Sequence, residues 1–172
     1  MHADFFALKC WLVSKWMWNP DLPAEPLLQR FFEGYYGAAA PYVRQYFDRM
    51  ERILRDDPKG RLSCWENDRP KIFTDELLDW SIALFDQAEA AVKDDPCLLL
   101  NVRAQAMAPI CMKLDRLGAK AKHFWVTRHP ERFPDYAAAR PLVARMKGTM
   151  AAYAAAGRGK IEKRLGDRKS VV

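Results

Sequence analysis

Apolar residues recur every three or four positions along most of this chain, which is the spacing of one face of an α-helix. The pattern predicts a first helix over residues 3–18, ending before Pro20, because a residue that precedes proline disfavours the α conformation. A second helix is expected over 24–33, with Gly34 at its C-terminal end.

The rest of the chain shows the same helical spacing. A third helix is expected to begin at Pro41, and a long irregular segment, 56–73, follows it. A fourth helix begins after Thr74, which is a good N-cap residue, and a fifth begins at Asp95-Pro96. A last, Ala-rich helix covers about 135–156, and no run of alternating residues is long enough for a strand. The prediction is therefore an all-α bundle of about six helices with one long irregular loop.

The apolar stripes of these helices indicate which side chains form the core. We expect five large side chains to be largely buried: Trp18, Phe32, Tyr36, Phe47 and Phe85. The fourth helix should bury Leu77, Leu78, Phe85, Ala88 and Val92. The first helix can bury only one of two opposite faces against the second and third helices. Either Phe5, Leu8, Leu12 and Lys15 or Phe6, Lys9, Val13 and Trp16 should therefore stay exposed.

The length of 172 residues fits one domain with a single core. We expect a helical domain over 1–156, made of the first three helices (3–55), the loop (56–73) and the remaining helices (74–156). Residues 157–172 form a basic tail that we expect to be flexible.

Charge is concentrated near the C-terminus. The net charge of the chain is +6, and from Arg140 onward nine basic and two acidic residues give +7, so the preceding part sums to −1. A basic tail attracts polyanions. No aromatic residue follows Tyr153, however, so the tail lacks rings on which bases could stack, and nucleic-acid binding is disfavoured.

Membrane and targeting signals are not evident. Charged residues such as Lys9, Lys15 and Asp79 interrupt the apolar stretches well before the ~20 residues that a membrane span needs. The apolar segment Phe5 to Val13 lacks a basic start and a small-residue cleavage site, so it does not predict a secretory signal. Four widely spaced cysteines are expected as unpaired core residues: Cys10, Cys64, Cys97 and Cys111.

Two aspartate pairs, Asp56-Asp57 and Asp94-Asp95, are the only obvious candidates for glycosidase-type acids. Each pair precedes proline at a helix boundary, where capping of backbone N–H groups explains it without catalysis. His123 and His129 are six residues apart, whereas zinc-binding helices place histidines three or four apart. We therefore predict no catalytic residue, no metal site and no cofactor in this chain.

Three segments carry a family resemblance. Leu8 to Asp21 reads LKCWLVSKWMWNPD, Phe31 to Tyr42 reads FFEGYYGAAAPY, and Leu84 to Pro96 reads LFDQAEAAVKDDP. They resemble the start of the C-terminal helical region of a bacterial carbohydrate-active family catalogued as domain of unknown function 4838. Proteins of that family join an α-glucuronidase-like or hexosaminidase-like (β/α) barrel to a helical tail.

The resemblance implies that this chain is a non-catalytic C-terminal helical domain that supports the catalytic barrel of a glycoside hydrolase-like, exported or periplasmic protein. The barrel, which this chain lacks, would be its main partner, and one face of the first helix would pack on it. Carbohydrate is a further candidate partner, since aromatic rings stack on sugar faces. The candidate rings are Trp16, Trp18, Tyr35, Tyr36 and Trp65.

Two alternatives stay open. Large aromatics at helical spacing also serve as core or interface anchors. The chain could instead be a free-standing helical interaction module whose basic tail binds a protein or nucleic acid. Upstream coding sequence in frame with Met1 that encodes a barrel would favour the first hypothesis over the second.

Overall fold

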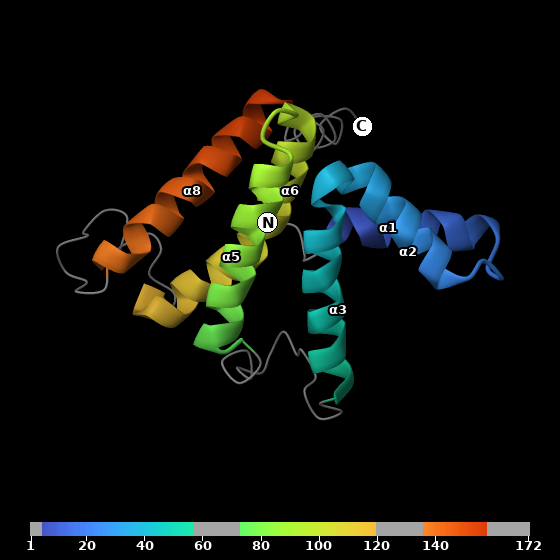
Figure 1. Ribbon diagram of the computed structural model, residues 1–172, viewed down its shortest axis with the longest axis horizontal. Helices are drawn as coiled ribbons and strands as arrows, with labels where there is room; N and C mark the ends of the chain where they lie inside the picture. Colours follow the sequence, from blue (N-terminus) through green and yellow to red (C-terminus); the bar gives the residue numbers. More distant parts are fainter. Residues whose placement is uncertain (1–4, 57–72, 120–135, 158–172) are drawn as a thin grey trace, which may run out of the picture.

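The computed structural model describes residues 5–56, 73–119 and 136–157, and within these ranges it contains helices and no β-strand. The all-α bundle predicted from the sequence is thus confirmed (Figure 1). The elements in chain order are α1 (Phe6–Trp18), α2 (Ala24–Tyr36), the 3-10 helix η1 (Gly37–Ala39), α3 (Ala40–Asp56), α5 (Asp75–Ala91), α6 (Pro96–Leu114), the π-helical turn η2 (Asp115–Ala119) and α8 (Tyr136–Ala155).

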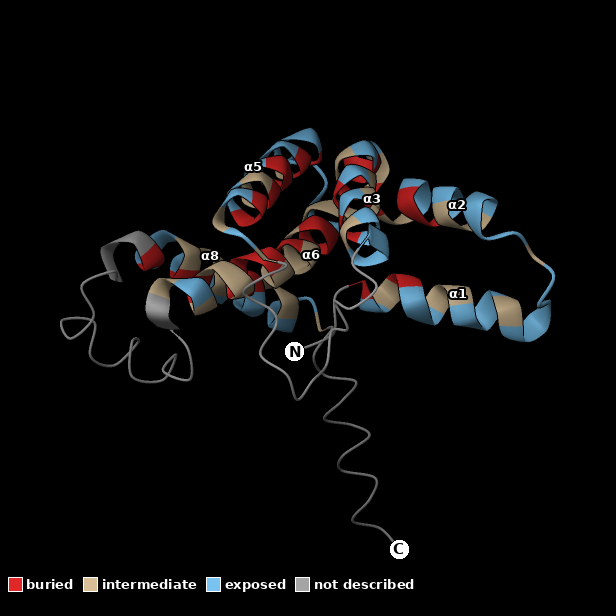
Figure 2. Cartoon of the chain, turned by 90° about the horizontal axis from the view of Figure 1, so that it is seen from below, coloured by how far each residue is buried: buried red, intermediate tan, exposed pale blue. Residues whose placement is uncertain are grey.

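The described helices share one hydrophobic core. α6 packs between α5 and α8, while α3 and α2 join this group through contacts with α5 and α6. α1 packs chiefly on α2, and the two lie side by side as a hairpin that projects away from α8 (Figures 1 and 2). α1 is therefore the helix with the least cover from the rest of the described chain.

The core lies where α3, α5 and α6 meet. Tyr46 of α3 contacts Phe85 of α5 edge-to-face, with ring centroids 5.1 Å apart. Val102 and Ile110 of α6 are buried in the same cluster. All five residues that the helical spacing placed on the buried stripe of the fourth helix are buried: Leu77, Leu78, Phe85, Ala88 and Val92.

Side-chain caps begin α5 and α6 where the sequence predicted them. The hydroxyl oxygen of Thr74 accepts a hydrogen bond from the backbone N–H of Leu77 at 3.3 Å. One carboxylate oxygen of Asp95 accepts from the N–H groups of Cys97 and Leu98, both at 2.9 Å. Asp95 thus has the capping role expected of it.

The predicted end of the second helix at Gly34 is wrong. α2 continues to Tyr36 and is capped by Gly37, whose φ of +54° lies in the left-handed region that favours glycine. A glycine inside a helix costs only about 1 kcal/mol relative to alanine. That cost is small beside the burial of Phe32 and Tyr36, which lie one helical turn apart and stack on each other.

The aromatic core agrees with the sequence prediction except at one position. Phe32, Tyr36 and Phe85 are buried and Phe47 is half-buried, but the predicted burial of Trp18 is wrong, because its side chain is 92% exposed. Trp18 is the last residue of α1, at the hairpin tip farthest from the core (Figure 2). A helical stripe buries its last residue only if the neighbouring element extends that far.

The expectation of core cysteines holds for only one of the three in the described ranges. Cys111 is buried and its thiol contacts the sulfur of Met146, whereas Cys10 and Cys97 are exposed. No helix in these ranges is long and apolar enough to cross a membrane. Most of the loop 56–73, with Cys64 and Trp65, lies outside the described residues, as do His123, His129 and all but Gly157 of the basic tail.

Candidate functional site

One face of α1 carries a row of exposed side chains that we call the α1 stripe: Phe6, Cys10, Val13 and Met17. Successive members are three or four residues apart, so they line one side of the helix over three turns. Val13 is 53% exposed and Met17 is 83% exposed. A continuous row of this kind differs from single exposed apolar residues, which are normal on protein surfaces.

The opposite face of α1 packs into the fold. Phe5, which precedes the helix, and Leu8 are buried, and the Trp11 ring lies 5.6 Å from the ring of Phe31 on α2. Of the two alternative faces defined from the sequence, the one with Phe6 and Val13 is therefore exposed. Trp16 departs from that face, since it is half-buried.

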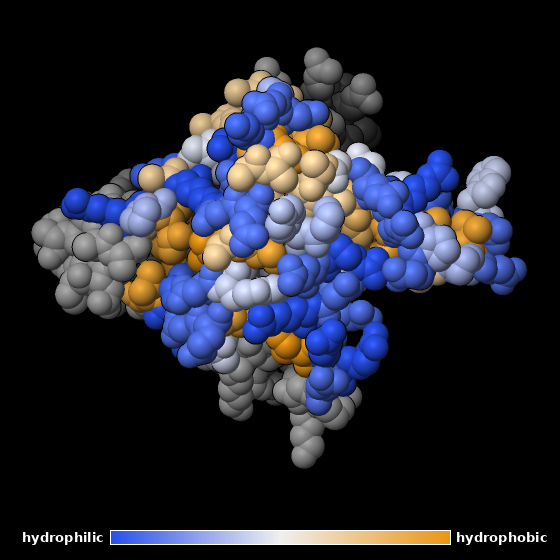
Figure 3. Space-filling view, viewed as in Figure 1, coloured by the Kyte–Doolittle hydropathy of each residue, from blue (hydrophilic) through white to orange (hydrophobic). Residues whose placement is uncertain are grey.

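α1 is apolar around nearly its whole circumference. Its only polar residues are Lys9, Ser14 and Lys15. Helices of this composition are usually buried on all sides, yet α2 covers only one side here. In the space-filling view, apolar surface shows between hydrophilic atoms over the α1–α2 hairpin (Figure 3).

The turn between α1 and α2 is held in shape by its own hydrogen bonds. The indole N–H of Trp16 donates to the carbonyl of Leu22 at 3.0 Å, and the side-chain oxygen of Asn19 accepts from the N–H of Asp21 at 3.1 Å. These bonds fix the chain around Trp18. Its exposed ring is therefore presented from an ordered turn rather than from a frayed helix end.

The four described carbohydrate-contact candidates occupy opposite ends of the hairpin. Trp16 and Trp18 lie at the tip, whereas Tyr35 and Tyr36 lie at the base, with ring centroids 5.0 Å apart. The Tyr36 ring is buried and its hydroxyl lies 3.3 Å from the side-chain oxygen of Gln105 on α6. The candidates therefore do not form one sugar-binding surface.

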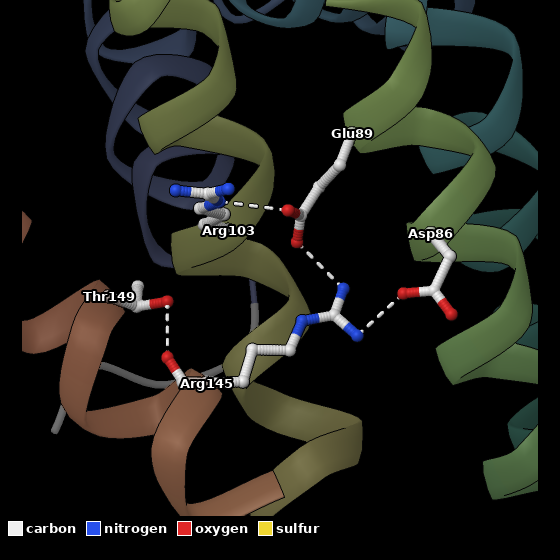
Figure 4. Close-up of polar contacts among 5 residues, drawn as sticks. All are labelled: Asp86, Glu89, Arg103, Arg145 and Thr149. Carbon is white, nitrogen blue, oxygen red and sulfur yellow. Dashed lines mark hydrogen bonds and ion pairs between the residues drawn. The ribbon is translucent and has the colours of Figure 1, made fainter. Parts of the chain in front are cut away.

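A second candidate site lies between α5, α6 and α8, and the sequence analysis did not identify it. Arg145 of α8 donates to Asp86 at 2.6 Å and to Glu89 at 2.7 Å, both on α5 (Figure 4). Arg103 of α6 donates to the other oxygen of Glu89 at 2.8 Å. With Gly148 and Thr149, these residues line an open pocket of about 350 Å³.

The polar cluster of Asp86, Glu89, Arg103 and Arg145 balances two carboxylates against two guanidinium groups. Both oxygens of Glu89 accept hydrogen bonds from arginine. A glycosidase acid instead holds a proton on an oxygen that faces the scissile bond. The geometry therefore fits a clamp that joins three helices better than a catalytic pair.

Residues 1–48 match the family described as domain of unknown function, DUF4838. The DUF4838 match covers α1, α2, η1 and the first half of α3, so it includes both the α1 stripe and the Gly-Tyr-Tyr-Gly segment. The third resembling segment, Leu84 to Pro96, lies beyond the match. Comparison with curated proteins and with solved structures gave no match.

A second ion-pair network holds the start of α5 against the end of α6. Asp75 accepts hydrogen bonds from Arg116 at 2.8 Å and from Lys113 at 3.0 Å. These bonds lower the pKa of the Asp75 carboxyl to about 2.

Within the described ranges, no group of three His, Cys, Asp or Glu side chains is arranged to hold a metal ion.

Proposed function

We propose that this chain is a non-catalytic helical domain that supports the (β/α) barrel of a carbohydrate-active, glycoside hydrolase-like protein. The observation that carries the proposal is the α1 stripe, an exposed apolar face inside the segment that matches DUF4838. The barrel and the C-terminal position come from the resemblance described above. In this proposal, the barrel covers the stripe.

Burial of the stripe gives the contact its free energy. Transfer of apolar surface out of water contributes about 25 cal/mol per Å². Met17 and Trp18 are the most exposed large apolar side chains of the described residues, and both lie at the hairpin tip. Trp is enriched among residues that dominate binding energy, so Trp18 should strengthen a contact that reaches the tip.

A sugar contact, if the domain makes one, is better assigned to the tip than to the base of the hairpin. Trp18 offers an exposed ring, with Asn19 and Asp21 beside it to accept hydrogen bonds from hydroxyl groups. Tyr36 would have to leave the core to reach a ligand. We therefore place the carbohydrate-contact proposal on Trp18 first and on Tyr36 last.

The proposal is tested by binding to a barrel. The chain is mixed with the barrel segment of a DUF4838 protein at concentrations up to about 1 mM, which match the effective concentration that a tether provides, and association is measured by analytical ultracentrifugation. Val13→Ser and Met17→Ser should each weaken association, because each removes apolar surface from the stripe. Met150→Ser on α8 is the matched control, since Met150 is 55% exposed but lies far from α1 along the chain.

Two binding results would contradict the proposed contact with a barrel, and one activity result would contradict the non-catalytic role. One is the absence of association with any barrel under conditions in which both parts are folded. The other is equal weakening by Met150→Ser and Met17→Ser, which would show that the effect is a general loss of surface hydrophobicity. Hydrolysis of aryl glycosides by the chain alone, abolished by substitution of an aspartate, would overturn its non-catalytic role.

A further inference from the structure

The size of the α1 stripe indicates what kind of partner covers it. From Phe6 to Met17 the stripe extends about 16 Å at 1.5 Å per residue. A large aromatic side chain offers at most 150–250 Å² of surface. Trp18 and Met17 are almost fully exposed and the other members of the stripe about half exposed or more, so these side chains together expose on the order of 500 Å². Stable complexes of separate proteins bury about 800 Å² on each partner. Contacts between domains of one polypeptide begin at about 600 Å² in total, or half that on each side.

The stripe therefore suits a tethered domain better than a second copy of the chain. A tether holds the partner at an effective concentration in the millimolar range, so a small contact is enough to keep the domains together. Two separate copies would have to associate through the same limited area without that help.

The charges on α1 indicate which charge the partner surface should carry. α1 contains two basic residues, Lys9 and Lys15, and no acidic residue. Lys9 is exposed and directly precedes Cys10, so it borders the stripe. The N-terminal end of a helix also carries a partial positive charge. The complementary surface is thus apolar in the middle and acidic at the border.

The spacing of the side chains in the stripe indicates which secondary structure of the partner would pack on it. Cys10, Val13 and Met17 follow one another at steps of three and four residues, the spacing by which one helix packs along another with its side chains inserted between those of the partner. This step rests on the proposed function. The outer layer of a (β/α) barrel is a ring of helices, and one of them would supply the partner helix. We propose that the α1 stripe is covered by an amphipathic helix of a tethered domain, apolar along the contact and acidic where it meets Lys9.

The exposed thiol of Cys10, in the middle of the stripe, allows a direct test on the whole chain. Two synthetic helical peptides share a row of leucines with a central cysteine, held as a mixed disulfide with glutathione. One has Glu residues beside the row and the other has Lys at the same positions. The Cys10 thiol displaces glutathione, which leaves as a thiol, so the number of disulfides does not change. Mass spectrometry of digested protein measures capture at Cys10 and, as an internal reference, at the exposed Cys97.

At equilibrium, the Glu peptide should be captured at Cys10 about three-fold more than the Lys peptide, since an exposed ion pair contributes about 0.2–1 kcal/mol. Capture at Cys97 should show no such preference. Lys9→Glu should reverse the preference at Cys10. Met17→Ser should lower the capture of both peptides there.

Equal capture of the two peptides at Cys10, or a preference that survives Lys9→Glu, would overturn the inference. So would chains linked to each other through Cys10 in preference to either peptide, because a second copy would then be the occupant. The peptides do not depend on a barrel. Selective capture of the Glu peptide without barrel binding would refute the proposed function alone, and barrel binding with equal peptide capture would refute this inference alone.

Discussion

Leu98 of α6 occupies the space beside Gly37: its Cδ1 atom lies 2.6 Å from the position that a Cβ atom on Gly37 would take. Gly37 also has a φ of +54°. The left-handed backbone therefore favours glycine after Tyr35-Tyr36, and a Cβ atom there would also displace the end of the Leu98 side chain.

Gly37→Ala should lower the free energy of unfolding by about 1–3 kcal/mol, because alanine strains the backbone and displaces Leu98. Urea denaturation measures the change. Gly34→Ala is the matched control, since, apart from the chain next to it in α2, no atom of the described residues lies within 4 Å of its Cβ position. That substitution should raise stability by about 0.5–1 kcal/mol. A similar loss in both variants would contradict the assignment of Gly37 as the cap.

Asp95→Ala should cost about 0.5–2 kcal/mol, because the carboxylate of Asp95 binds two backbone N–H groups at the start of α6. Thermal melts monitored by circular dichroism measure the loss. Asp95→Ser should recover most of it, since serine also caps helices. Asp94→Ala removes the same charge one residue earlier and should have little effect; a comparable loss there would mean that charge rather than capping matters.

Stability should fall in acid partly through Asp75. Its pKa of about 2 in the folded protein lies below the ordinary value of 3.8, because Arg116 and Lys113 donate hydrogen bonds to the carboxylate. The contribution is therefore fully present above about pH 4 and is lost as the pH falls through 2. Asp75→Asn should be less stable than the wild type at pH 7, and the gap in melting temperature should shrink between pH 4 and pH 2. A gap that stays constant across that range would refute the ion-pair origin.

Arg145 and Glu89 should be energetically coupled. Their side chains are 21% and 16% exposed, so solvent screens this pair less than a surface pair. A double-mutant cycle with Arg145→Met and Glu89→Gln should give a coupling free energy of about 1–2 kcal/mol. The exposed pair Arg55–Glu51 within α3 is the reference and should give at most about 0.5 kcal/mol. Equal coupling in the two cycles would show that the cluster does not clamp the helices.

Local signals in the sequence were sufficient to predict the helices and the starts of α5 and α6, whereas α1 begins at Phe6 and not at position 3 as predicted. Thr74 and Asp95 cap through atoms within three residues, so no knowledge of the tertiary structure is needed to predict these bonds. The end of α2 was different. Gly34 and Gly37 are both followed by helical residues, and the helix passes the first because Phe32 and Tyr36 are buried in a core that distant elements complete, which local spacing does not show.

The candidate sites divide in the same way. The helical spacing predicted that one of two opposite faces of α1 would be exposed. Which face it is, the one with Phe6 and Val13, depends on where α2 lies. The polar cluster left only a faint signal, the placement of Asp86 and Glu89 three residues apart on one side of α5. Its key partner, Arg145, is 56 positions from Glu89, and a helical pattern does not indicate which distant charges will meet.

The segment that matches DUF4838 ends at residue 48, in the middle of α3, and this has a consequence for how such proteins recombine. Tyr46, inside the matched segment, packs on Phe85 of α5, and Met50, just beyond it, is buried in the same core. Exchange of residues 1–48 alone between two genes would split one helix and place Phe85 against a residue from the other gene. Since Tyr46 of α3 packs on Phe85 of α5, a crossover within α3 or between α3 and α5 would bring together core residues from different genes, so the hairpin, α3 and α5 should be inherited together as one block.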